Sequence, residues 1–166
     1  MATKTSYEER AIKFITTILA PIYATAQNAN RYSRAIYDYN EKHKRPLNYE
    51  VGFTRVTVIR NDYVVKITYN YSKEIGDNQA EADNYEIAKE AGYEYLFAKP
   101  TLFEYMGMLF EIMPKVNHIG DLDRCFSDYL TADELQFVRD NFDDLHEYNV
   151  GYYRNKPVFI DYSCKA

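Results

Sequence analysis

The chain has 166 residues, of which 46% are hydrophobic and 27% charged, enough for one globular domain or two small lobes. Its net charge of -5 excludes the overall positive field of proteins that bind nucleic acid or anionic membranes. No apolar run approaches the roughly 18 residues of a membrane-spanning helix. Cys125 and Cys164 lie far apart with no CxxC motif, as expected of free thiols in a reducing compartment. We therefore expect a cytoplasmic protein with no nucleic-acid or membrane partner.

The chain is predicted to begin with an amphipathic helix. Ser6 and Glu9 have the spacing of a capping box, which satisfies free N–H groups at a helix start. The apolar residues that follow recur at a helical period as far as Tyr23. Pro21 lies inside this stretch, and we expect it to kink or split the helix because proline lacks an N–H donor.

A second helix is predicted from Asn30 to His43, and Pro46 closes the helical region. The one dense basic cluster of the chain, Lys42, Lys44 and Arg45, lies where this helix ends. We interpret the cluster as a solvated helix end, because cations suit helix C-termini. The aromatic residues of this helical pair favour core packing, with dimerisation as an alternative.

Strands are predicted after Tyr49, where β-branched and aromatic residues become frequent. We expect a hairpin in which residues Thr54–Arg60 pair with Tyr63–Thr68 around an Asn61–Asp62 turn.

A helix then returns from Asn78 to Ala91, with Gly92 as its natural stop. Two further strands are predicted at Leu102–Met106 and Met108–Met113, on either side of Gly107.

The last third of the chain mixes helices with a small hairpin. A short helix is predicted within Asp121–Tyr129, and a capped helix from Thr131 to about Asn141. Strands follow near Tyr152–Tyr153 and at Val158–Ile160. The whole pattern predicts an α+β fold: helices first, an antiparallel sheet with one inserted helix, then a helical part with a hairpin.

Three oxygen-bearing side chains in this last third have an order that suits phosphoryl transfer. Asp144 precedes Asn149 by five residues, and Asp161 follows an apolar strand. Phosphoryl transfer uses a carboxylate to orient the attacking hydroxyl, and amide and carboxylate oxygens to hold magnesium. Asp and Asn are also common in surface loops, which is the alternative interpretation of each residue taken alone.

The Asp-Leu-His-x-x-Asn stretch that begins at Asp144, with the element order around it, resembles the protein-kinase-like superfamily. The branch that contains aminoglycoside and small-molecule kinases is the most similar, as are short kinase-like proteins of bacteriophages. The resemblance extends from Tyr49 to Ser163. It implies a minimal kinase-like fold with an N-terminal helical extension at 1–46, an N-lobe-like sheet plus helix at 47–116, and a truncated C-lobe at 117–166.

The resemblance also implies the roles of the motif residues and two cofactors, ATP and magnesium. Asp144 matches the catalytic base, and Asn149 and Asp161 match the two metal ligands. Lys66, within Val-Val-Lys-Ile, matches the strand lysine that contacts the nucleotide phosphates.

The family pairs this lysine with a carboxylate on the following helix. Glu81, Glu86 and Glu90 are the candidates within the predicted helix. Glu81 lies at the edge of the predicted buried face, whereas Glu86 points away from it. We therefore expect Glu81 to be the partner.

Two more segments correspond to nucleotide-binding parts of the family. Gly52 lies where the family has a glycine-rich phosphate loop, but it is the one glycine there, which predicts a lowered nucleotide affinity. The strand Phe110–Met113 matches the hinge, where backbone groups of Glu111 and Met113 would bind adenine.

Five residues follow Asp161, so the helices that bind the acceptor in the family have no counterpart in this sequence. The first hypothesis is an ATP-dependent phosphotransferase that acts on a hydroxyl acceptor. The alternatives are a catalytically inactive kinase-fold binding module, such as a phage inhibitor or adaptor of a host protein in the host cytoplasm, or a virion or structural protein.

Overall fold

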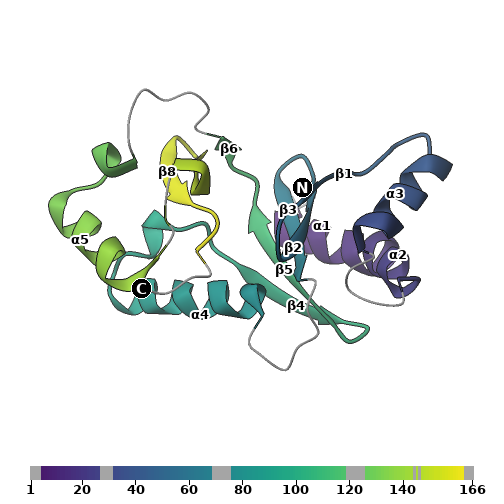
Figure 1. The fold of residues 1–166 in the computed structure, drawn as a ribbon, viewed down its shortest axis with the longest axis horizontal. Helices are drawn as coiled ribbons and strands as arrows, with labels where there is room; N and C mark the ends of the chain where they lie inside the picture. The colour runs from purple at the N-terminus through teal and green to yellow at the C-terminus, as the bar shows by residue number, and fades with distance from the viewer. Residues whose placement is uncertain are drawn as a thin grey trace. The chain divides into compact units, whose positions relative to one another are not determined.

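The computed structural model describes residues 5–26, 32–68, 76–118, 126–143, 145 and 147–162 (Figure 1). These residues form helices and antiparallel sheets, which confirms the predicted α+β class. The chain divides into two compact units: Met1–Asn78 with Thr101–Lys115, and Gln79–Pro100 with Val116–Ala166. The predicted N-terminal helices thus belong to the same unit as the five-stranded sheet, and the predicted three-part division remains a prediction.

The first unit begins with an interrupted helix followed by a separate one. The elements are α1 (Tyr7–Phe14), the π-helical turn η1 (Ile15–Leu19), α2 (Ala20–Ala24) and α3 (Tyr32–Lys42). Ser6 and Glu9 form the predicted capping box, in which each side chain accepts a hydrogen bond from the backbone of the other residue. The predicted break near Pro21 takes the form of the π-helical turn η1, which ends two residues before the proline. Pro21 has no N–H group to donate to the preceding turn, and the wider π-helical turn accommodates this missing hydrogen bond.

The sheet of this unit has five antiparallel strands in the order β1-β2-β3-β5-β4. They are β1 (Asn48–Val51), β2 (Arg55–Ile59), β3 (Tyr63–Thr68), β4 (Thr101–Tyr105) and β5 (Met108–Pro114). The predicted hairpin of β2 with β3 is confirmed, and the two strands predicted around Gly107 are present as β4 and β5, which pair with each other. Met106 and Gly107 both have positive φ, at 53° and 73°, as a two-residue hairpin turn requires.

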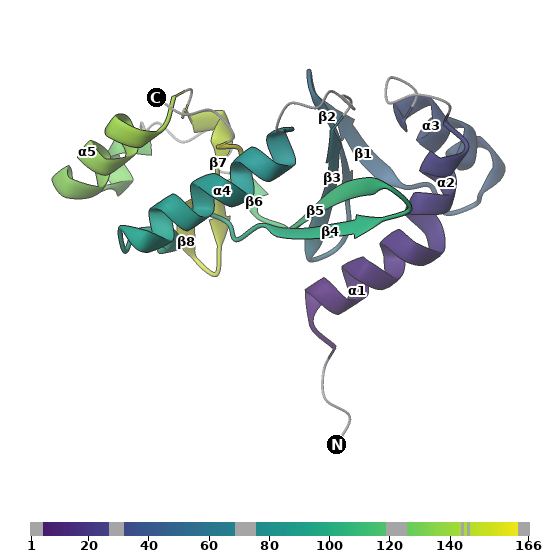
Figure 2. The same cartoon turned by 90° about the horizontal axis from the view of Figure 1, so that it is seen from below.

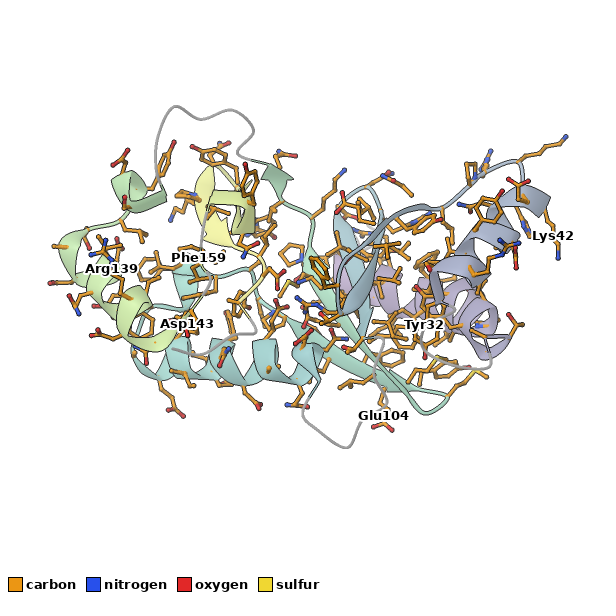
Figure 3. The ribbon with its side chains drawn as sticks, viewed as in Figure 1. Tyr32, Lys42, Glu104, Arg139, Asp143 and Phe159 are labelled. Atoms are coloured by element: carbon orange, nitrogen blue, oxygen red, sulfur yellow. The ribbon has the colours of Figure 1, made fainter. Side chains whose placement is uncertain are left out.

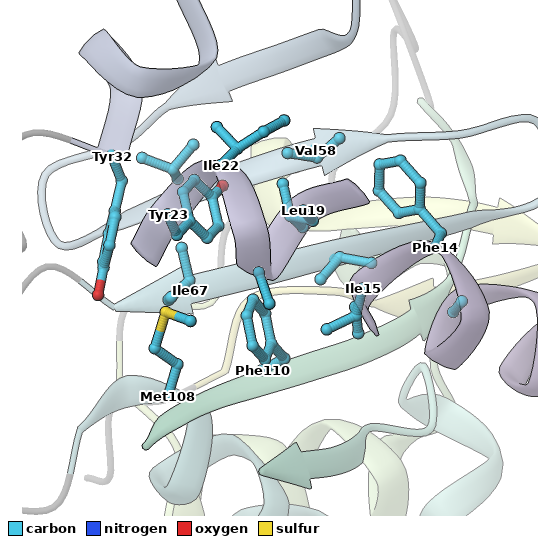
Figure 4. Close-up of a cluster of buried hydrophobic side chains, with 14 of the residues drawn as sticks. Phe14, Ile15, Leu19, Ile22, Tyr23, Tyr32, Val58, Ile67, Met108 and Phe110 are labelled. Carbon is cyan, nitrogen blue, oxygen red and sulfur yellow. The ribbon is translucent and has the colours of Figure 1, made fainter. Parts of the chain in front are cut away.

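The core of the first unit lies between its helices and one face of the sheet. Figure 2 shows α1 running alongside this sheet, and Figure 4 shows side chains of the helices meeting those of the strands. Ile15 and Leu19 are fully buried in the helices, and Val58, Ile67 and Phe110 are buried on the strands. On the strands, these core residues alternate with residues of the opposite face.

The second unit is built from helices and a three-stranded antiparallel sheet of order β6-β7-β8. Its elements are α4 (Asp77–Glu90), η3 (Glu94–Leu96), β6 (Asn117–His118), η4 (Phe126–Tyr129), α5 (Ala132–Asn141), η5 (Glu147–Asn149), β7 (Val150–Tyr153) and β8 (Lys156–Phe159). The first two residues of α4, Asp77 and Asn78, belong to the first unit. Of the short helix predicted at Asp121–Tyr129, the described residues form one 3-10 turn, and residues 121–125 lie outside the described part. Strand β6 was not predicted, because two residues carry no periodicity.

Gly92 ends α4 as predicted. Its φ is 80°, the Tyr93 N–H donates to the Ala88 carbonyl, and the Gly92 N–H donates to the Lys89 carbonyl. These two bonds form a Schellman motif, which satisfies carbonyl groups at the end of the helix.

Aromatic rings form the centre of the second unit. The Phe97 ring lies 5.0 Å from that of Phe142, 5.4 Å from that of Phe159 and 4.9 Å from that of Tyr162. Tyr162 is buried, and its hydroxyl donates to the Ala98 carbonyl at 2.6 Å. The end of the described chain is therefore anchored in the core of this unit.

We predict that Gly151→Ala destabilises the protein by about 1–3 kcal/mol, the usual cost of overpacking. A Cβ at position 151 would lie 2.3 Å from Cγ2 of Val116 and 3.0 Å from the Asn117 backbone oxygen. Urea unfolding measures the change. Gly76→Ala is the control, because its Cβ would meet the Thr68 side chain at an ordinary 3.6 Å. Equal stability of the two variants would contradict the packing around β7.

Candidate functional site

Lys66 belongs to a buried charged cluster in the first unit. Its neighbours in β3, Val65 and Ile67, point into the core, so Lys66 lies on the opposite face of the sheet. Its Nζ lies 3.3 Å from Oε1 of Glu111 on β5. Nη1 of Arg55 on β2 lies 3.8 Å from the other oxygen of the same carboxylate. All three residues are at most 7% exposed. A carboxylate thus holds two cations in fixed positions on one sheet face.

Gly52 lies in a tight turn between β1 and β2. Its N–H donates to the carbonyl of Arg55 at 2.8 Å, which leaves Phe53 and Thr54 as the tip of the turn. Phe53 is fully exposed there. The structure therefore engages the backbone donor of Gly52 within the turn, so a phosphate would meet fewer free N–H groups than in a glycine-rich loop.

Glu111 and Met113, the predicted adenine-binding positions, lie in β5, between β3 and β4. Glu111 has Lys66 beside it on β3 and Leu102 beside it on β4. Because both neighbouring positions are occupied by strands, a base that bound the Glu111 backbone would have to replace a hydrogen bond of the sheet. Met113 pairs with Val64 of β3 and lies one residue beyond the last position paired with β4.

Glu81 is the buried one of the three candidate glutamates on α4. Its side chain is 0% exposed, whereas Glu86 and Glu90 are exposed, as the helical period predicted. Within the second unit, its Oε1 accepts a hydrogen bond from the Tyr162 N–H at 3.0 Å. The predicted pairing of Glu81 with Lys66 remains a prediction.

Asn84 lies one helical turn after Glu81 and binds the carbonyl group of Tyr162, the residue whose N–H group Glu81 binds. Its Nδ2 donates to the Tyr162 carbonyl at 2.6 Å, and its side chain is fully buried. Glu81 and Asn84 together hold the main chain of Tyr162, the residue directly after Asp161. We call this arrangement the α4 clasp. It fixes the segment that carries one predicted metal ligand.

The structure places Asn149 and Asp161 at the same end of the β7–β8 hairpin. Val150 pairs with Phe159 at the open end of the β7–β8 hairpin, and the Ile160 N–H donates to the Asn149 carbonyl at 2.9 Å. Asn149 and Ile160 are therefore opposite each other, and Asp161 is the next residue along. Asp161 is exposed and Asn149 is half-buried. Two oxygen-bearing side chains twelve residues apart in sequence thus lie at one end of a hairpin.

Asp144, the predicted catalytic base, and His146 of the same motif lie outside the described residues, as do Cys125 and Cys164. Across the described residues, no three His, Cys, Asp or Glu side chains are grouped to hold a metal ion. In the same part of the chain, no helix is long and apolar enough to cross a lipid bilayer.

Two buried polar residues were not predicted to act near the site, Asn78 and Asn84. Asn78 donates to the backbone carbonyls of Lys66 and Leu109, which are on neighbouring strands. The sequence did contain a signal for Asn84, because it falls on the predicted apolar face of its helix. A polar residue on such a face needs a hydrogen-bond partner.

The sequence matches no known protein family, and no curated protein is similar to it. Among solved structures, the medium-resolution structure of the bifunctional kinase-methyltransferase WbdD is similar, with a TM-score of 0.36 and 18% identity, over 74% of this chain and 34% of that chain. The co-crystal structure of WbdD with the kinase inhibitor LY294002 has a TM-score of 0.34 and 20% identity, over 74% and 33%. This chain spans about a third of their length, and no residue's role follows from similarity at this level.

We predict that Asn84→Leu lowers the free energy of unfolding by about 1–3 kcal/mol, because the buried Tyr162 carbonyl loses its amide donor. Glu86→Ala on the same helix is the control, since its ion pair with Lys89 is exposed and contributes at most about 0.5 kcal/mol. Urea unfolding of both variants measures the difference. An effect of Asn84→Leu no larger than that of the control would contradict the α4 clasp.

Proposed function

We propose that this protein binds ATP as its magnesium complex. The observation that carries the proposal is that Asn149 and Asp161, an amide and a carboxylate distant in sequence, lie at the same end of the β7–β8 hairpin. An amide oxygen and a carboxylate are ligands that magnesium accepts, with phosphate and water oxygens completing its octahedron. The α4 clasp supports the proposal, because a metal ligand binds best when the surrounding structure fixes its position.

In this proposal Lys66 contacts the phosphates. Its ammonium group is held on a central strand by Glu111 rather than on a mobile loop. Arg55 provides a second cation on the same sheet face, and a guanidinium binds phosphate oxygens well. These two cations compensate for the weak phosphate binding expected of the single-glycine turn at Gly52, where few backbone N–H groups remain for phosphates.

Phosphate transfer to a hydroxyl acceptor is the reaction that this arrangement would serve. The acceptor oxygen forms a bond to the γ-phosphorus, and the bond from that phosphorus to the bridging oxygen of ADP breaks. Asp144 takes the proton of the acceptor hydroxyl as the transfer proceeds. Asn149 and Asp161 would hold the magnesium ion, which would supply positive charge to the phosphate oxygens.

A catalytically inactive binding module of kinase-like architecture is the second candidate. The tight turn at Gly52 favours it, because its backbone donor already serves Arg55. Under this hypothesis the protein binds a nucleotide weakly or not at all, and its function depends on a protein partner.

We predict that calorimetry with ATP detects binding that requires magnesium and that EDTA abolishes. Asp161→Asn should weaken the binding at least about tenfold, or ~1.4 kcal/mol, because it removes a charged metal ligand. Asp161 is exposed, so this change leaves the core intact. Asp140→Asn, another exposed carboxylate of the second unit, is the control and should bind like the wild type.

Absence of magnesium-dependent binding, or equal affinity of both variants, would overturn the proposal. Transfer is measured separately with γ-labelled ATP and a panel of hydroxyl acceptors. Asp144→Asn should abolish transfer while binding persists, and the neighbouring exposed Asp143→Asn should not (Figure 3). Binding without transfer to any acceptor would favour the inactive module.

A further inference from the structure

The first unit has a groove between its two helical segments. One wall comes from η1 and α2 and the other from α3, and the groove encloses about 540 Å³. It lies on the helices, whereas Lys66 and Arg55 lie on the sheet. The groove is therefore a separate feature from the residues proposed to bind the nucleotide.

Apolar side chains line a large part of the groove. They belong to Ile18, Pro21, Ile22, Ala35 and Tyr39, which we call the apolar floor. Two threonines of the same wall, Thr17 and Thr25, donate their hydroxyls to carbonyls of their own helix, at 2.6 and 2.7 Å. Because these donors are already used, both threonines contribute little polar character to the wall.

One end of the groove is rigid and aromatic. The rings of Tyr39 and His43 stack with centroids 3.7 Å apart and an angle of 13° between their planes. Nδ1 of His43 lies 2.7 Å from the Tyr39 carbonyl oxygen, which fixes the imidazole at the end of α3. A preformed wall of this kind costs little conformational entropy when a ligand binds.

The same end of the groove is positively charged. Lys42 lines the groove at the outer end of α3 (Figure 3), and the exposed Lys44 and Arg45 follow it in the sequence. Within the described part of the chain, none of these three cations has an ion pair with a carboxylate. The carboxylate of Asp38, which also lines the groove, is paired with Arg34 at 2.9 Å. One exposed glutamate, Glu41, lies in this stretch, so the cations outnumber the free carboxylates.

We propose that this groove binds an acidic amphipathic helix of a partner protein. The walls have apolar residues at helical spacing, Ile18 with Ile22 and Ala35 with Tyr39, and a third helix packs into a groove of this form. Leucine-like residues of the partner at positions i, i+4 and i+7 would cover the floor. Carboxylates at one end of the partner helix would meet Lys42, Lys44 and Arg45.

The charges favour this occupant over two others. A favourable interaction with the C-terminus of α3 explains a cation in the last turn of the helix, which is Lys42. It does not explain Lys44 and Arg45, which follow the last residue of α3. A second copy of this chain carries its net charge of -5 spread over the whole sequence, whereas the cations at the end of the groove match carboxylates gathered at one end of a helix. Nucleic acid would contact the cations but would leave the apolar floor uncovered.

The test is selection from a display library of helical peptides with randomised charged positions, against the full-length protein. We expect enrichment of peptides with apolar residues at i, i+4 and i+7 and with glutamate or aspartate at one end. Fluorescence anisotropy then measures a selected peptide against variants. The combined Lys42→Glu, Lys44→Glu and Arg45→Glu variant should lose about tenfold or more in affinity, as should Ala35→Trp, which fills the floor.

Lys115→Glu is the matched control, an exposed cation of the same unit, and should bind within about twofold of the wild type. Thermal melts establish that each variant is folded. The proposal is overturned if no peptide enriches, if enriched peptides are not acidic, or if Ala35→Trp binds them unchanged. It is also overturned if Ala35→Trp abolishes self-association seen by sedimentation, or if single-stranded DNA binds the cations more tightly than the selected peptide.

Discussion

Two side chains of α4 bind the backbone N–H and carbonyl groups of Tyr162. The geometry of the candidate metal site depends on this constraint. Glu81 accepts the N–H and Asn84 donates to the carbonyl, and both side chains are fully buried. The Tyr162 ring packs in the aromatic core around Phe97. The preceding residue, Asp161, is therefore placed by a helix and a core rather than by a free chain end. A buried polar network of this kind is costly to break and defines one conformation.

In the first unit, too, buried side chains fix the positions of candidate site residues, which here lie on strands. Lys66 and Arg55 are fixed by a single buried carboxylate, that of Glu111, in the centre of the sheet. A flexible glycine-rich loop usually supplies many phosphate contacts, but here the β1–β2 turn is short and its Gly52 donor is engaged. In the proposed function, charge on rigid strands takes the place of backbone donors on a loop. The proposed chemistry rests on positions that buried residues hold in advance.

Local signals were readable from the sequence, and long-range pairings were not. The capping boxes at Ser6 and Thr131 and the stop at Gly92 depend on neighbouring residues, and the structure confirms them. Helical period places Glu81 at the edge of the predicted buried face of its helix, and the structure buries it fully. The bond from Asn84 to Tyr162 joins residues 78 positions apart, and the sharing of Glu111 by Lys66 and Arg55 depends on strand order. The period of apolar residues shows which face of a helix or strand is buried, but it does not show which distant residue packs against that face.

The central claim is that Asn149 and Asp161 hold a metal ion that binds with a nucleotide. NMR with Mn²⁺ in place of magnesium tests it directly, because the paramagnetic ion broadens the resonances of nearby amides. The account predicts that, with ATP present, the amides of Val150, Ile160 and Tyr162 broaden first and that Asp161→Asn abolishes the effect. Broadening confined to other parts of the protein, or identical broadening in Asp161→Asn, would contradict it.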